Sequence, residues 1–206
     1  MILTCLDLEG VLLPEIWINV ALKTGIEELK LTTRDISDYD VLMKKRLGIL
    51  DAHRITIGDI QQVIGTLDPL EGAVDFLDEL RHEFQVIILS DTFYQFAMPL
   101  MKKLGFPALF CHDLVIDERS GRITGYTLRQ TDSKRKAVEG FRNLNFRTIA
   151  AGDSYNDTTM LAEADRGILF RPPQNVIDEF PQYPVAVSYD GLINEFRSAA
   201  VAIGAE

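Results

Sequence analysis

The stretch that decides the fold is Ile2-Leu3-Thr4-Cys5-Leu6-Asp7-Leu8-Glu9-Gly10, an apolar run that ends in two carboxylates and a glycine. A short continuous apolar run followed by a turn residue is typical of a strand that is buried on both faces. In open parallel sheets, catalytic groups collect beyond the carboxyl ends of the strands. Because Asp and Gly also end strands for reasons of turn geometry, the pair is a candidate site that other strand ends must support.

Length and composition restrict the class of protein. The chain has 206 residues, 47% of them hydrophobic, which suits one domain or one domain with a small insertion. Its formal net charge of −10 disfavours nucleic acid as a partner, because the field of the protein repels a polyanion. No run of apolar residues is long enough to predict a membrane span. The two cysteines lack disulfide or metal-ligand spacing, so we expect a cytoplasmic protein. The sequence does not reveal its oligomeric state.

Further apolar runs alternate with amphipathic segments along the chain. The predicted strands are Ile2 to Leu6, Val86 to Leu89, Arg147 to Ala151, Gly167 to Phe170 and Val185 to Val187. The predicted helices are Leu70 to Glu83, Tyr94 to Leu104, Ser133 to Leu144, Asp157 to Ala164, Gln174 to Phe180 and Asp190 to Val201. This alternation predicts an α/β fold with a doubly wound parallel sheet and a Rossmann-type core. A small β-hairpin is predicted over Leu114 to Gln130, with its turn at Asp117-Glu118-Arg119-Ser120-Gly121.

One interval is too long for a simple crossover. About eighty residues separate the first strand from the second, and the excess, residues 14–68, has a helical pattern. Pro14-Glu15 is predicted to begin one helix, and Ser37 with Asp40 forms a capping-box pattern that begins another. We therefore expect a core domain of residues 1–13 and 69–206, with a helical cap subdomain of residues 14–68 placed directly after the acidic strand end.

Two other strand ends carry polar side chains of the same kind. The second strand is followed by Ser90-Asp91-Thr92, and the third by Gly152-Asp153-Ser154-Tyr155-Asn156-Asp157. Ser90 or Asp153 alone is also explained as a helix cap. In a parallel sheet, however, these ends share one edge, so we expect Asp7, Glu9, Ser90, Asp153 and Asp157 to converge. A carboxylate cluster without His or Cys favours Mg²⁺, which usually takes its remaining ligands from water and phosphate, so the predicted chemistry is phosphoryl transfer.

These residues resemble the four motifs of the haloacid dehalogenase superfamily of aspartate-nucleophile phosphatases. The motifs correspond to Asp7-Leu8-Glu9-Gly10-Val11, Ser90, Lys134, and Gly152-Asp153 with Asp157. The resemblance implies that Asp7 is the nucleophile and that Ser90 and Lys134 hold the phosphoryl oxygens. It also implies a Mg²⁺ site formed by Asp7, the backbone carbonyl of Glu9, and Asp153, with Asp157 in support of Lys134. Glu9 would be the general acid and base, although the family pattern has Asp there. Without this resemblance, the local sequence would predict that Lys134 is a solvated surface residue.

The predicted cap suggests a substrate class. Arg46 falls inside an apolar helical stripe formed by Tyr39, Leu42, Met43, Leu47 and Leu50, and a guanidinium facing the packed side suits a carboxylate. The alternative is that Arg46 extends its head to solvent from the edge of the core. Glu15 suits an ammonium group, or simply the electrostatics of a first helical turn. An acid and an arginine above a phosphate site would bind a phosphorylated amino acid.

The cap and motifs also resemble phosphoserine phosphatases, and the Ser90-Asp91-Thr92-Phe93 and Gly152-Asp153-Ser154-Tyr155-Asn156-Asp157 stretches are most similar to the ThrH-type branch. That resemblance implies phosphoserine phosphatase activity together with phosphoryl transfer to homoserine, and Asp91, Thr92 and Asn156 as further substrate contacts. Two alternatives stay open: a phosphatase of another small phosphoester, and a non-catalytic regulator that binds phosphate ligands.

Overall fold

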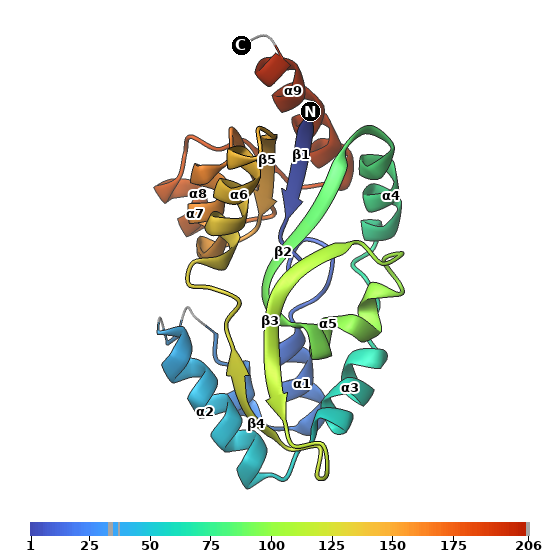
Figure 1. The fold of residues 1–206 in the computed structure, drawn as a ribbon, viewed down its shortest axis with the longest axis vertical. Helices are drawn as coiled ribbons and strands as arrows, with labels where there is room; N and C mark the ends of the chain where they lie inside the picture. Colours follow the sequence, from blue (N-terminus) through green and yellow to red (C-terminus); the bar gives the residue numbers. More distant parts are fainter. Residues whose placement is uncertain (33–34, 37, 205–206) are drawn as a thin grey trace.

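A twisted, mostly parallel sheet forms the centre of the molecule (Figure 1). The computed structural model describes residues 1–32, 35–36 and 38–204. Within them the strand order is β4-β3-β2-β1-β5-β6-β7, and β4 alone is antiparallel to its neighbour. The strands are β1 (Ile2–Leu6), β2 (Gln85–Phe93), β3 (Ala108–Ile116), β4 (Ile123–Thr127), β5 (Arg147–Gly152), β6 (Arg166–Phe170) and β7 (Val185–Ala186). The doubly wound α/β fold predicted from the sequence is confirmed.

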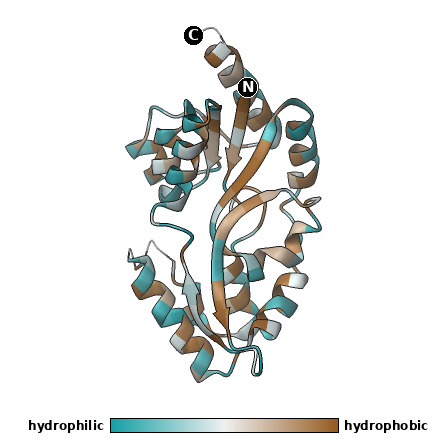
Figure 2. Cartoon of the chain, viewed as in Figure 1, coloured by the Kyte–Doolittle hydropathy of each residue, from teal (hydrophilic) through white to brown (hydrophobic). Residues whose placement is uncertain are grey.

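Helices cover both faces of the sheet, and the central strand β1 is mostly apolar (Figure 2). Along β1, Leu6 packs into one hydrophobic cluster and Cys5 into the other, as the two-residue period of a strand requires. The larger cluster includes α4 (Ala73–Glu83), α5 (Tyr94–Met101) and α9 (Tyr189–Gly204), and the smaller one α6 (Ser133–Asn143), α7 (Thr158–Glu163) and α8 (Gln174–Glu179). No helix in the described part of the chain is long and apolar enough to cross a bilayer.

Apart from the short 3-10 helix η2 (Tyr155–Asp157), which follows β5, the remaining helices form a separate lobe beyond the carboxyl ends of β1 and β2 (Figure 1). They are α1 (Ile16–Thr24), η1 (Glu27–Lys30), α2 (Tyr39–Ala52) and α3 (Ile57–Gly65). The segments that connect this lobe to the sheet lie side by side, since Leu70 N–H donates to Leu12 O over 3.0 Å. The β3–β4 hairpin also packs on this lobe: Ile57 N–H donates to Gly121 O, and the Tyr126 hydroxyl to Asp40.

The beginnings of the lobe helices have clear local causes. Asp38 caps α2 by accepting a hydrogen bond from Val41 N–H, while Ser37, the predicted capping residue, lies outside the described residues. Thr56 and Asp59 form a reciprocal capping box at the start of α3. Gly25 ends α1 in the left-handed conformation, which costs a glycine little.

Two strands differ from the sequence prediction. β2 continues to Phe93 instead of ending at Leu89, because β3 keeps pairing with it as far as Phe93 and His112. Leu89 pairs with Phe110, and the next pair is Phe93 with His112. β2 therefore has four residue steps between these two pairs where β3 has two, so β2 bulges. Such bulges re-aim side chains near functional sites. The first half of β3 was not predicted, because His112 and Asp113 interrupt its apolar run.

The sheet order places the site. Successive strands run outward from β1 in one direction and from β5 in the other, so the order reverses between these two neighbours. Ligands of doubly wound proteins bind beyond the carboxyl ends of the strands at such a point. Asp7 follows β1 and Asp153 follows β5, so both acids lie at the reversal.

Candidate active site

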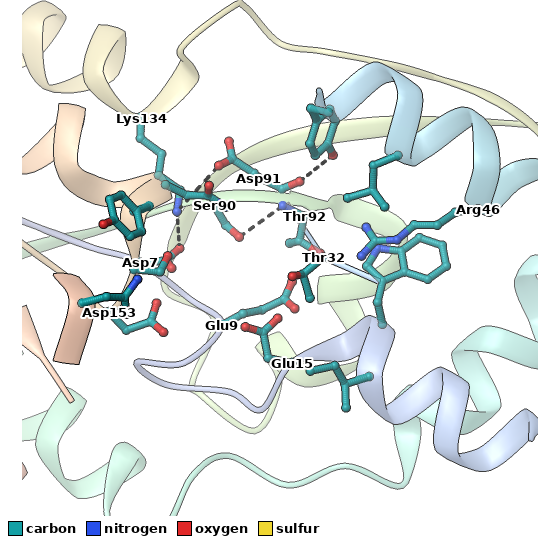
Figure 3. A pocket seen from close by; sticks show the side chains of 18 residues that line it. Asp7, Glu9, Glu15, Thr32, Arg46, Ser90, Asp91, Thr92, Lys134 and Asp153 are labelled. Carbon is teal, nitrogen blue, oxygen red and sulfur yellow. Dashed lines mark hydrogen bonds and ion pairs between the residues drawn. The ribbon is translucent and has the colours of Figure 1, made fainter. Parts of the chain in front are cut away.

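A cavity of about 430 Å³ lies between the sheet and the lobe, a size suited to a small metabolite (Figure 3). Every predicted site residue except Asp157 lines it: Asp7, Glu9, Glu15, Arg46, Ser90, Asp91, Thr92, Lys134, Asp153 and Asn156. The sheet edge contributes Asp7, Glu9, Ser90 and Asp153, and the start of α6 contributes Lys134. The N-terminus of α1 and helix α2 contribute Glu15 and Arg46 at the opposite end. The structure thus brings together residues that the sequence separates by more than a hundred positions.

Lys134 occupies the floor of this cavity. Its ammonium nitrogen lies 2.7 Å from Oδ1 of Asp7 and 2.7 Å from Oδ1 of Asp157, and all three side chains are buried. Burial alone disfavours the charged amine, but the surrounding carboxylates raise the pKa of Lys134 well above its usual range. Lys134 therefore stays a cation at neutral pH. It is an interior charge at the start of α6, not the solvated surface lysine that its local sequence suggests.

Asp157 lies behind this lysine, outside the cavity. Its second oxygen accepts hydrogen bonds from Asp153 N–H over 2.9 Å and from Ser154 N–H over 3.1 Å. The carboxylate fits directly against Gly152, where an added Cβ would lie 2.3 Å from its carbon. Asp157 therefore fixes both the ammonium of Lys134 and the loop that carries Asp153.

The acids form a site suited to a cation. Oxygens of Asp7, Asp153 and Asp157 lie within 4.8 Å of one another. Burial, followed by the charge of Asp157, raises the pKa of Asp7 well above its usual value despite the nearby Lys134. The single ammonium group of Lys134 thus does not balance the negative charge of the three carboxylates, and a hard divalent cation would reduce their repulsion. Gly10 permits the arrangement, because its φ of +80° and a Cβ clash of 2.5 Å with Asp153 would exclude larger residues.

Glu9 is partly buried at the junction of sheet and lobe. Its Oε2 accepts a hydrogen bond of 2.8 Å from Ile16 N–H, the first residue of α1. Burial and then the charge of Glu15 raise its pKa to about 7, although the bond from Ile16 and a bond from Thr92 act in the opposite direction. The longer side chain of Glu thus reaches a helix N-terminus of the lobe. A pKa near neutrality suits a group that must donate and later accept a proton.

Arg46 does not extend to solvent. It is only 7% exposed, its guanidinium lies 4.5 Å from the ring centroid of Trp17, and one nitrogen donates to Leu31 O over 2.7 Å. Burial lowers its pKa to about 10, so it remains charged. Its Nε is the buried side-chain atom that finds no hydrogen-bond partner among the described residues. An unsatisfied buried donor beside a cavity indicates a place for an acceptor from a ligand.

The β2 bulge supplies three adjacent groups. Ser90 is buried, and its hydroxyl oxygen accepts from Thr92 N–H over 3.2 Å. Lys134 lies 3.8 Å from Asp91, and Ser133 donates to Asp91 over 3.1 Å. Burial alone would raise the pKa of Asp91, but Lys134 and the nearby His112 bring it down to about 2. Asp91 is therefore an ionised member of the lysine network.

Sequence reasoning missed several residues of the cavity wall. They are Trp17, Ile18, Thr32, Tyr39, Leu42, Ser154, Tyr155 and Asn175. Tyr39 and Leu42 gave a signal, since both belong to the apolar stripe of α2 that also contains Arg46. Asn175 gave none, because it follows the last motif.

The fold and this arrangement of acids, serine and lysine define a class of enzyme. Residues 20–162 match the family of haloacid dehalogenase-like hydrolases, and the chain belongs to that family. It is 64% identical to phosphoserine phosphatase ThrH of Pseudomonas aeruginosa over 200 residues, which cover 97% of each chain. It is 63% identical to a phosphoserine phosphatase of Pseudomonas syringae pv. tomato, over 96% of this chain and 83% of the other.

Solved structures show the same fold. A phosphoserine phosphatase from T. onnurineus in complex with NDSB-201 superposes with a TM-score of 0.73 at 24% identity, over 93% of this chain and 92% of the other. A phospho-aspartyl intermediate analogue of phosphoserine phosphatase superposes with a TM-score of 0.71 at 21% identity, over 90% and 92% of the two chains.

Proposed function

We propose that this hydrolase removes the phosphoryl group of phosphoserine and is also able to pass it to homoserine. The observation that carries the proposal is one cavity with Asp7 and Lys134 at its floor and Glu15 and Arg46 on its lobe side. The first pair suits a phosphoryl group and the second an α-amino acid. The names of the two relatives that are 64% and 63% identical support the same substrate.

The first half of the reaction uses Asp7 as nucleophile. A carboxylate oxygen of Asp7 forms a bond to phosphorus while the ester oxygen of the substrate leaves, which produces an aspartyl phosphate. Lys134 and the hydroxyl of Ser90 hold phosphoryl oxygens, one by charge and one by hydrogen bonding. Glu9 donates its proton to the departing serine oxygen. Its pKa of about 7 provides the protonated form at neutral pH.

The second half reverses the role of Glu9. As a carboxylate it accepts a proton from an incoming hydroxyl, whose oxygen attacks phosphorus and releases Asp7. Water as acceptor yields inorganic phosphate, and homoserine yields phosphohomoserine. Both outcomes use the same residues, because the acceptor enters where serine left.

The carboxylate cluster fits Mg²⁺, with Asp7, the backbone carbonyl of Glu9, and Asp153 as the proposed ligands. Bound there, the ion would neutralise charge between the nucleophile and the phosphate dianion. Asp157 lies near enough to belong to the cluster, yet Lys134 and two backbone N–H groups already occupy its oxygens. We therefore assign Asp157 to positioning and not to metal binding.

The amino-acid end of the substrate is assigned to the lobe. Glu15 would face the ammonium group and Arg46 the carboxylate, with the unpaired Nε of Arg46 as the free donor. Thr92 and Asn156 line the same cavity and are proposed as further contacts. Asp91 was predicted as another, but its place in the lysine network favours a different role, developed below.

The test is phosphate release from phosphoserine with and without Mg²⁺, measured for the wild type, Asp7→Asn and Glu9→Gln. We expect chelation and Asp7→Asn to abolish release and Glu9→Gln to slow it severely. Adding homoserine should lower free phosphate and produce phosphohomoserine. Phosphoserine turnover that survives Arg46→Ala would favour another phosphoester as substrate, and wild-type inactivity across a phosphoester panel would favour a binding protein. The cytoplasmic location expected from the unpaired cysteines stays a prediction.

A further inference from the structure

Three carboxylates surround the ammonium group of Lys134, but only two accept hydrogen bonds from it. Asp7 and Asp157 each lie 2.7 Å from the nitrogen, whereas the nearest oxygen of Asp91 lies 3.8 Å away. An ammonium group has three hydrogens, so two are used and the third has no acceptor within normal hydrogen-bond distance among these acids. Figure 3 shows Asp7 and Asp91 on different sides of this nitrogen.

Two buried side chains hold Asp91 away from the lysine. Ser133, 4% exposed at the start of α6, donates its hydroxyl to Oδ1 of Asp91 over 3.1 Å. His112, 3% exposed on β3, places Nε2 at 3.6 Å from the same oxygen. The backbone N–H of Arg129 donates to His112 Nδ1 over 3.1 Å, so Nδ1 is the acceptor and the ring proton lies on Nε2, facing Asp91. Both groups therefore face Oδ1 of Asp91, whereas the oxygen that faces Lys134 is Oδ2.

The backbone of Asp91 is held as well. Its carbonyl oxygen accepts a hydrogen bond of 3.0 Å from the hydroxyl of Tyr39, the first residue of α2. The Tyr39 ring meets His112 edge-on, with ring centroids 6.4 Å apart. β2 pairs with β3 on either side of Asp91, at Leu89 and at Phe93, so the strand is anchored at both ends of the bulge.

We propose that Ser133 and His112 are positioning residues that restrain Asp91, so that its charge supports Lys134 while the third ammonium hydrogen stays available for a phosphoryl oxygen. The inference rests on the proposed function in one respect, the phosphoryl group as ligand of Lys134. Without the restraint, rotation of Asp91 brings its carboxylate onto the lysine, and the phosphoryl group must then displace a charged hydrogen bond. Losing such a bond weakens binding roughly tenfold or more.

The test uses Ser133→Ala, His112→Leu and Asp91→Asn, alone and combined. Steady-state kinetics with phosphoserine give KM and kcat, and calorimetry with inorganic phosphate in the presence of Mg²⁺ gives a Kd that does not depend on turnover. We expect Ser133→Ala to raise both KM and the phosphate Kd about tenfold, with a smaller change in kcat. In the Asp91→Asn background, which lacks the competing charge, Ser133→Ala should change neither value.

Control variants separate this role from a merely structural one. His112→Gln keeps a donor near the position of Nε2, so its phosphate Kd should lie closer to that of the wild type than the Kd of His112→Leu does. Ser188→Ala removes another serine hydroxyl at a helix start, the one that accepts from Gly191 N–H, and should leave KM and Kd unchanged. If His112→Leu does not fold, Ser133→Ala with its double mutant still decides the matter.

The proposal fails if Ser133→Ala leaves the phosphate Kd unchanged, or if it raises the Kd by the same factor with and without Asp91→Asn. A wild type that does not hydrolyse phosphoserine overturns the proposed function instead, and the phosphate Kd values still test the restraint on Asp91.

Discussion

Replacing Asp157 with Asn should destabilise the protein and disturb the site at once. Both oxygens of Asp157 accept hydrogen bonds, and the donors are Lys134 Nζ, Asp153 N–H, Ser154 N–H and the Ser154 hydroxyl. The amide of Asn has only one accepting oxygen. Whichever way it turns, its NH₂ group faces a buried donor, and the charge opposite Lys134 is lost.

The magnitude follows from the burial of Asp157, which is 0% exposed. Breaking a buried ion pair by removing one partner costs about 3–5 kcal/mol. Because Lys134 keeps its hydrogen bond with Asp7, we expect the lower end, about 3 kcal/mol. For a chain of this length, that corresponds to a fall in Tm of roughly 6–12 °C.

The assay is thermal unfolding of Asp157→Asn beside the wild type, followed by titration with Mg²⁺. The variant should also need more Mg²⁺ for half-maximal activity, because the loop carrying Asp153 loses an anchor. Asp75→Asn, an exposed acid in the first turn of α4, is the matched control and should shift Tm little. A fall in Tm below about 2 °C with an unchanged Mg²⁺ requirement would refute the reasoning.

Three further predictions concern other parts of the molecule. Gly10→Ala places a Cβ 2.5 Å from Asp153, so the Mg²⁺ concentration for half-maximal activity should rise roughly tenfold. The control Gly48→Ala, whose Cβ would enter open space, should leave that Mg²⁺ concentration unchanged. Equal Mg²⁺ requirements for the two variants would contradict this prediction. Arg46→Met should lower kcat/KM for phosphoserine roughly 10- to 100-fold but spare a phosphoester without a carboxylate, and equal losses on both would remove Arg46 from carboxylate binding. Asp165→Asn tests a pH effect: burial alone would raise the pKa of Asp165, but hydrogen bonds from Thr148 and the charges of Arg142 and Arg147 lower it. Its folded pKa is thus below the unfolded value of about 3.9, so the carboxylate stabilises the fold above that pH, and this stabilisation is lost as the pH falls through the folded pKa. The difference in Tm between Asp165→Asn and the wild type should be constant from neutrality to about pH 5 and shrink below about pH 4. A difference that persists in acid would disprove the assignment.

Much of the core was predictable because it depends on local pattern. The apolar runs at Ile2–Leu6 and Arg147–Gly152 are strands in the structure almost as predicted, since a strand buried on both faces must be apolar throughout. Parallel pairing then places the carboxyl ends of these two strands side by side, and Asp7 and Asp153, which follow them, lie close together.

Other features were not predictable because distant partners decide them. The extension of β2 through Ser90 to Phe93 depends on pairing with β3, and the first half of β3 was not recognised because His112 interrupts its apolar run. His112 is a polar interruption in its own sequence, yet it is satisfied by Arg129 and Asp91. No local pattern encodes such partners.

The sequence by itself determined the order of strands and helices, the acidic strand ends and the apolar stripe that contains Arg46. Only the tertiary structure decided what these groups meet. It placed Lys134 between Asp7 and Asp157, buried Arg46 beside Trp17, tied Glu9 to the first turn of α1, and turned Asp91 toward Ser133 and His112. The physical reason is that periodicity records which face of an element is buried, whereas the pKa and the partner of a buried charge depend on atoms brought close by the chain as a whole.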